Sequence, residues 1–150
     1  MIAYYGSTVK FDTWDITKTK EFGYHFGLEK PGSSLHRIFQ SGGFLYEVDL
    51  SWKNAITMQD PFFWDLLAIL AQLGQLTDYD RLKKLAAGQA RINKNSLRTQ
   101  SNIIAAKILD DMNYDAILYE SSGEEGGRCV IIWHPEQICL QSIKEIPPTI

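Results

Sequence analysis

A carboxylate in a glycine-rich turn is the pattern in this sequence with the clearest potential for chemistry. Residues 120–127 read Glu-Ser-Ser-Gly-Glu-Glu-Gly-Gly, and Gly and Ser favour tight, solvated turns. Asp115–Tyr119 and Cys129–Trp133 flank this run and have the apolar, β-branched composition of short strands. A carboxylate held at such a turn can move a proton or stabilise developing positive charge. The carboxylates at the centre of this run are Glu124 and Glu125, and the alternative is an ordinary solvated acidic turn.

An imidazole and several aromatic rings near the N-terminus form a second candidate group. The segments Ile2–Tyr5 and Gly23–Gly27 are predicted strands, and His25 lies in the second of them. Because strand side chains alternate between faces, His25 is expected on the face opposite Tyr24 and Phe26. His36 and His134 have no second ligand at metal-binding spacing, so they are interpreted as structural and no metal site is predicted.

Composition narrows the class of protein. The chain has 150 residues, 45% of them hydrophobic and 22% charged, which is typical of one globular domain spanning 1–150. The formal net charge of −3 and the lack of a Lys/Arg-rich block argue against nucleic acid as a partner. The net charge does not rule out a local basic patch. Phe62–Leu70 is too short to cross a bilayer, and the first residues lack the pattern of a signal peptide. We therefore expect a cytoplasmic protein with no membrane partner, in which Cys129 and Cys139 are buried free thiols.

The elements that must position these residues fall into three blocks. Strands are expected first, including Phe44–Leu50, and strands return after about residue 114. The middle block is predicted to be helical, starting at Asp60-Pro61, then from Asp78 to about Arg91, then from near Ser96 to Asn113. The sequence thus predicts an α+β fold, a split and mostly antiparallel β core with an inserted helical segment.

Several segments, taken in order, resemble one family. Residues 4–7, Tyr-Tyr-Gly-Ser, resemble the Tyr-His-Gly-Ser/Thr opening strand of bacterial and phage ADP-ribosyltransferases, including the domains of polyvalent phage proteins. Residues 11–15 are similar to the Phe-Asp-x-Phe-Asp spacing that follows, and residues 23–27 to Gly-x-His/Tyr-Phe-Gly/Thr. Residues 114–119 resemble the Tyr-Asp-Gly-Ile-x-Tyr strand, and 130–138 the closing strand with Pro-Glu-Gln-Ile. The size and layout are also similar to those of small phage anti-defence ADP-ribosyltransferases, and the middle, about residues 61 to 105, is matched by layout alone.

The resemblance implies an activity, a co-substrate and roles for particular residues. It implies transfer of ADP-ribose from NAD to a protein acceptor, with nicotinamide as the leaving group and Glu124 as the catalytic acid. Gly6 would clamp the nicotinamide amide through its backbone, and His25 would stack on nicotinamide. The residues implied to contact NAD are Tyr5, Gly6, Ser7, His25 and Phe26, with Phe26 more typical of a core residue.

Two departures from the family pattern keep other functions open. Tyr5 occupies the place of the family His that contacts the adenosine-side ribose, although its hydroxyl can still hydrogen-bond. Ser122 replaces the Glu typical of arginine-modifying relatives, which argues against an arginine acceptor, and Glu120 is out of register for that role. The alternatives are an NAD glycohydrolase that depletes NAD, and a catalytically degenerate fold of this type that only binds a partner.

Overall fold

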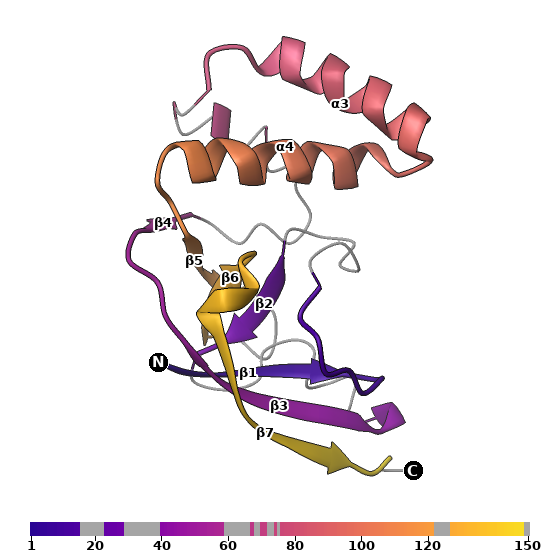
Figure 1. Cartoon of the computed structure of the whole chain (residues 1–150), viewed down its shortest axis with the longest axis vertical. Helices are drawn as coiled ribbons and strands as arrows, with labels where there is room; N and C mark the ends of the chain where they lie inside the picture. Colours follow the sequence, from indigo (N-terminus) through magenta and orange to yellow (C-terminus); the bar gives the residue numbers. More distant parts are fainter. Residues whose placement is uncertain are drawn as a thin grey trace.

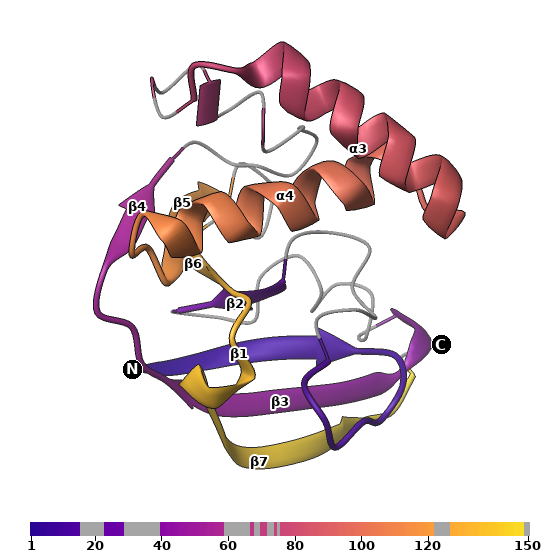
Figure 2. The same ribbon diagram turned by 45° about the horizontal axis from the view of Figure 1, so that its top comes forward.

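Two long helices lie on one side of a seven-stranded sheet (Figure 1). This arrangement is that of a computed structural model, which describes residues 1–15, 23–28, 40–58, 67, 70–71, 74, 76–121 and 127–148. The helices are α3 (Tyr79–Asn93) and α4 (Leu97–Asp111), and α4 lies between α3 and the sheet (Figure 2). The described residues therefore form a mixed α+β structure, as the sequence predicted.

The strands confirm most of the expected segments. Their bounds are β1 (Ile2–Ser7), β2 (Tyr24–Gly27), β3 (Gly43–Leu50), β4 (Ala55–Thr57), β5 (Ala116–Ser121), β6 (Gly127–Ile132) and β7 (Ile138–Ile146). Their order across the sheet is β4-β5-β6-β2-β1-β3-β7. The pairs are antiparallel except β4 with β5, which is parallel.

One junction in the sheet is much weaker than the others. Among the described residues, the ladder between β1 and β2 contains the one pair Tyr4–Gly27, whereas β1 and β3 are paired along six positions. In the described part of the chain, the well-paired groups β4-β5-β6-β2 and β1-β3-β7 meet at this pair. β6, from the later part of the chain, pairs with β2 on the side away from β1.

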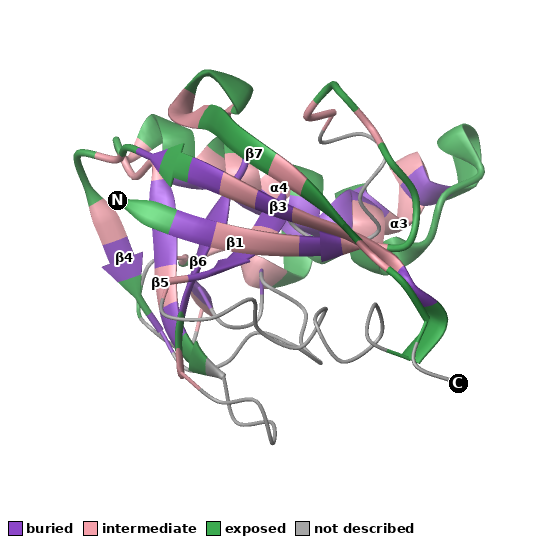
Figure 3. Ribbon diagram, turned by 90° about the horizontal axis from the view of Figure 1, so that it is seen from below, coloured by how far each residue is buried: buried purple, intermediate pink, exposed green. Residues whose placement is uncertain are grey.

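Each face of the sheet carries its own apolar cluster. On the helix side, Leu109 of α4 packs with Ile117, Tyr119 and Ile131, and this cluster also includes Leu67. On the other side the cluster is built from β1, β2, β3, β5 and β6; its members are Ala3, Tyr24, Phe26, Val48, Leu50, Ala116, Val130 and Ile132. Figure 3 shows buried stretches along β3, whereas the edge strand β7 is largely exposed. Both faces of the central strands of the sheet are thus apolar.

Local signals explain both ends of α4. Ser96 precedes α4, and its hydroxyl accepts a hydrogen bond from the Thr99 N–H at 3.0 Å, which satisfies one of the free donors of the first turn. After α4, Asn113 adopts a φ of 65°, the left-handed conformation that Asn tolerates and that ends helices. The predicted helices from Asp78 and from Ser96 are confirmed within a few residues.

The structure corrects several predictions. β4 and β7 were not predicted, and the segment 130–138 is not one strand: β6 ends at Ile132 and a short 3-10 helix, Pro135–Gln137, follows. Cys129 is buried, but Cys139 is exposed, so the expectation of two buried thiols is wrong for Cys139, which lies on the edge strand β7. The predicted start of a helix at Asp60-Pro61 lies outside the described residues, as does His36. Among the described residues, no helix is long and apolar enough to cross a membrane.

Candidate functional site

Tyr5 of β1 lies in a cluster of aromatic rings that has six members among the described residues. Its ring centroid is 5.5 Å from that of Tyr24, 5.8 Å from those of Phe26 and Trp14, and within 6.5 Å of the Phe11 and Tyr46 rings. Most of these contacts are edge-to-face, the geometry that aromatic pairs favour. The Tyr5 ring is therefore part of a packed aromatic layer, and it is half-buried.

Two tyrosine hydroxyls attach the segment after β1 to this layer. The Tyr46 hydroxyl accepts from the Phe11 N–H at 2.6 Å and donates to the Phe11 carbonyl at 2.8 Å. The Tyr24 hydroxyl makes the same two contacts with Asp15, each at 2.9 Å. Burial raises the pKa of the Tyr24 phenol above its usual value, which favours the neutral form that donation to the Asp15 carbonyl requires. The Phe11–Asp15 motif thus has a structural role of holding this segment on the sheet.

His25 lies on the opposite face of the sheet from Tyr5. Its Nδ1 is 2.8 Å from the Tyr119 hydroxyl, and Tyr119 belongs to the cluster beneath α4. The register pairs Gly27 and Tyr119 with Cys129 and pairs His25 with Ile131, so His25, Tyr119 and the buried Cys129 share one face. Tyr5 instead contacts Phe26, whose side chain leaves β2 on the other face. A ligand touching both Tyr5 and His25 must therefore lie at the junction of β1 and β2.

The two small residues of the first motif occupy the end of β1. Gly6 is buried and lies opposite Leu45 of β3. The Ser7 hydroxyl donates to the Val9 carbonyl at 2.7 Å and accepts from the Val9 N–H at 3.2 Å, a local turn that ends the strand. Gly23, in the second motif, has a φ of +67°, and a Cβ there would lie 2.5 Å from the Ile132 carbonyl oxygen. Glycine is thus required at position 23 because β6 approaches the backbone closely.

The acidic turn follows β5 in a hairpin with β6. Ser121 and Gly127 form the last described pair of this hairpin, and Glu124 and Glu125 lie outside the described residues. The Leu28 N–H donates to the Arg128 carbonyl at 3.0 Å, so β2 runs beside β6 as far as this end of the hairpin. Glu120 is exposed and faces Arg128 across the two strands, on the side of the sheet away from Tyr119.

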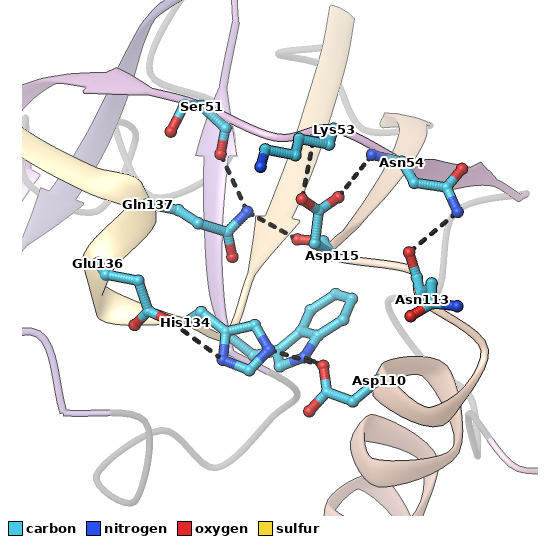
Figure 4. Close-up of polar contacts among 10 residues, drawn as sticks. Ser51, Lys53, Asn54, Asp110, Asn113, Asp115, His134, Glu136 and Gln137 are labelled. Atoms are coloured by element: carbon cyan, nitrogen blue, oxygen red, sulfur yellow. Dashed lines mark hydrogen bonds and ion pairs between the residues drawn. The ribbon is translucent and has the colours of Figure 1, made fainter.

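A polar network joins the motifs Tyr114-Asp115 and Pro135-Glu136-Gln137 (Figure 4). The Asp115 carboxylate accepts from the N–H groups of Lys53 and Asn54, each at 2.8 Å. The Gln137 side-chain amide donates to the carbonyls of Ser51 and Asp115, each at 2.9 Å. In the sequence, these residues stand out only as parts of strand motifs. The structure gives them a structural role, because they tie the loop before β4 to the start of β5 and to the 3-10 helix.

Replacing Asp115 with Ala is expected to lower the free energy of unfolding by about 2 kcal/mol. The change removes both acceptors from two backbone N–H groups, and hydrogen bonds to charged groups are each worth about 1.5–3 kcal/mol before allowance for exposure. Asp111→Ala is the matched control at an exposed position, with an expected change within about 0.5 kcal/mol. Urea denaturation followed by circular dichroism measures both, and equal losses would contradict the structural role of Asp115.

His134 lies in a second polar group, also visible in Figure 4. Its Nε2 is 2.6 Å from Asp110 Oδ1, and the same oxygen accepts from the Trp133 indole N–H at 2.9 Å. Glu136 is 3.8 Å from His134 Nδ1. These contacts join the end of α4 to the segment after β6. Among the described residues, no three His, Cys, Asp or Glu side chains are grouped to hold a metal ion.

Three consecutive polar residues in α4 are buried, which the sequence analysis missed. Gln100, Ser101 and Asn102 are each less than 5% exposed. The Ser101 hydroxyl and the Asn102 side-chain oxygen have no hydrogen-bond partner within the described part of the chain. Because consecutive helical residues point in different directions, their burial means that α4 is enclosed on more than one side. The spacing of polar residues along the helix does not predict this burial.

No protein-family model, curated protein or solved structure matches this chain. Its function must therefore be inferred from its own residues and their arrangement.

Proposed function

We propose that this chain transfers ADP-ribose from NAD to a protein acceptor and releases nicotinamide. The observation that supports this most is the order of four neighbouring strands, β5-β6-β2-β1. The segments that resemble the family, about residues 5, 25 and 119, lie far apart in sequence but on three of these strands. Structural roles explain Gly23 and Asp115 individually, but they do not require the segments that resemble the family to lie within one run of four strands.

The chemistry assigned to these residues balances without a metal. The bond between ribose C1′ and the nicotinamide nitrogen breaks, and its electron pair leaves with nicotinamide. A nucleophilic atom of the acceptor attacks C1′, and its proton passes to the Glu124 carboxylate. The same carboxylate stabilises the positive charge that develops on ribose, which favours the transition state over the bound substrate. The Gly6 backbone would hold the carboxamide, and His25 would lie against the nicotinamide ring.

A second candidate, a binding module without catalysis, is favoured by one specific observation. On β2, β5 and β6, the described side chains that share the face of His25 are Ile117, Tyr119, Cys129 and Ile131. None of these is a carboxylate, so catalysis depends on the turn that contains Glu124. The packed Tyr5 ring also differs from a His that is free to contact ribose.

Incubation of the protein with NAD labelled in its adenylate part, together with a bacterial lysate, tests the proposal. Label attached to protein supports transfer, and free labelled ADP-ribose without modified protein would instead indicate an NAD glycohydrolase. Calorimetry with NAD completes the test. If no labelled protein and no free ADP-ribose form, and NAD does not bind, the chain is a binding module without catalysis. Mass spectrometry of the labelled protein identifies the modified side chain.

His25→Ala is expected to weaken NAD binding while leaving the fold intact. The structure adds a matched control, Tyr119→Phe, which removes the same hydrogen bond and keeps the imidazole. Both variants should lose about 0.5–1.5 kcal/mol of stability, the usual net value of one hydrogen bond. Only His25→Ala should raise the Kd for NAD, measured by calorimetry. If His25→Ala unfolds the protein, or if both variants bind NAD like the wild type, the stacking role of His25 is wrong.

A further inference from the structure

Helix α3 has an outward face that nothing in the described part of the chain covers. Its inward stripe is Leu82, Ala86 and Ala90, which are buried. The opposite face recurs at helical spacing and consists of Arg81, Lys84, Leu85, Gly88, Arg91 and Ile92. These six residues are called the outer face of α3 below. Arg81, Lys84 and Arg91 are charged, and such side chains are ordinary in solvent. Leu85 and Ile92 are large and apolar, so these two decide what the face means.

The apolar pair on the outer face is unusually exposed. Ile92 is 80% exposed and Leu85 is 45% exposed. They are seven residues apart, two helical turns, so both point the same way. Single exposed aliphatic residues are ordinary, but two aligned on one face surrounded by charge have the composition of a protein-binding surface, an apolar centre with a polar rim.

The charge of this region is opposite to that of the rest of the chain. Residues 78–111, which hold both helices and the residue before α3, contain seven Lys or Arg residues and four acidic residues, a formal charge of +3 in a chain whose total is −3. All seven basic side chains are exposed. On the outer face, Arg81 bonds to Asp78, whereas Lys84 and Arg91 have no ion-pair partner among the residues that the structure describes. The face therefore favours an anionic partner.

Gly88 lies in the middle of the outer face. Glycine inside a helix destabilises it relative to alanine. A Cβ at position 88 would meet no atom within 4 Å, so no contact inside the chain requires glycine there. Glycine does allow the backbone or side chain of another molecule to approach the helix closely. Its position between Leu85 and Ile92 is therefore consistent with a partner packed across the helix.

We propose that the outer face of α3 is a docking surface for an acidic protein segment that presents aliphatic side chains between carboxylates. A second copy of this chain packed through the same face would set like charges against each other. Nucleic acid fits less well, because phosphate contacts do not bury aliphatic side chains and the face has no aromatic residue for base stacking. A membrane surface would call for a broader apolar face with aromatic anchors.

The test uses a synthetic acidic helical peptide with Leu at heptad positions a and d and Glu at e and g, labelled for fluorescence anisotropy. The wild-type protein should bind this peptide, and added salt should weaken the complex. Arg91→Glu and Ile92→Ala should each raise the Kd about tenfold, which corresponds to about 1.4 kcal/mol. Gly88→Ala should raise the melting temperature and weaken peptide binding together. Because NAD is absent, the result is independent of the proposed transferase activity.

Matched controls separate this surface from a general effect of charge. Lys144→Glu makes the same change of charge at an exposed position on β7, and Ile103→Ala removes an aliphatic side chain that is 54% exposed on α4. Both should leave the Kd unchanged. The proposal is overturned if the controls weaken binding as much as Arg91→Glu and Ile92→Ala do. It is also overturned if the peptide does not bind, or if a DNA duplex or phosphatidylserine vesicles bind more tightly than the peptide.

Discussion

Glu124→Ala is expected to lower the rate of ADP-ribose transfer by about a hundred- to a thousand-fold, the usual cost of losing one preorganised electrostatic group. The carboxylate acts mainly where positive charge develops on ribose, so its loss lowers turnover more than NAD affinity. The sequence around it, residues 121–127, is polar and rich in Gly, so a substitution there should change the free energy of unfolding by within about 0.5 kcal/mol. Turnover with labelled NAD, calorimetry and urea denaturation measure the three quantities.

Glu125→Ala is the matched control for this prediction, because it removes a carboxylate from the adjacent position. It should change the transfer rate little. If the two phenotypes are exchanged, Glu125 is the catalytic acid and the assignment is shifted by one residue. If neither variant affects transfer, Glu120 becomes the candidate. Glu120 is exposed and opposite Arg128, on the face of the sheet away from His25.

Phe26→Ala is expected to lower the free energy of unfolding by about 3–5 kcal/mol, the range for truncating a buried aromatic residue. Phe26 is fully buried, and its ring lies 5.4 Å from Trp14 and 5.8 Å from Tyr5 between centroids. Truncation removes these contacts and leaves a cavity in the layer that fills one face of the sheet. Since a domain of this size has a total stability of about 5–15 kcal/mol, the variant should be partly unfolded at modest urea concentrations.

Phe44→Ala provides the comparison, because Phe44 is also on a strand but is only half-buried and lies outside both apolar clusters. Phe44→Ala should lower the free energy of unfolding by clearly less than Phe26→Ala does. Chemical denaturation followed by tryptophan fluorescence compares the two variants. If Phe26→Ala is as stable as the wild type and loses NAD binding instead, Phe26 contacts the co-substrate and its core role is wrong.

Local sequence signals predicted the helices and most of the strands because those signals act over a few residues. Ser96 begins α4 and Asn113 follows it, as capping preferences require. The alternation of β2 placed His25 opposite Tyr24 and Phe26, and the clusters on the two faces agree. β7 was missed because it is an edge strand, exposed along much of its length, so it lacks the apolar alternation that marks a half-buried strand.

The partners of the motif residues depended on tertiary structure. Nothing in the sequence places Asp115 beneath the N–H groups of Lys53 and Asn54, since these residues are about 60 positions apart. The same holds for the Tyr46 hydroxyl on the Phe11 backbone. Cys139 appeared buried from its strand-like neighbours, and only the edge position of β7 exposes it.

Propensity, capping and periodicity are local properties, so they were enough to predict the α+β class, the bounds of α3 and α4 within a few residues, and the faces of individual strands. Which strands are neighbours depended on contacts between distant segments: β2 pairs with β6 on one side and, among the described residues, with β1 through Tyr4–Gly27 on the other. Tertiary structure also decided that Tyr5 packs among aromatic rings while His25 contacts Tyr119 on the opposite face. The physical reason is that strand pairing and side-chain burial are set by contacts between residues distant in sequence, which no local pattern specifies.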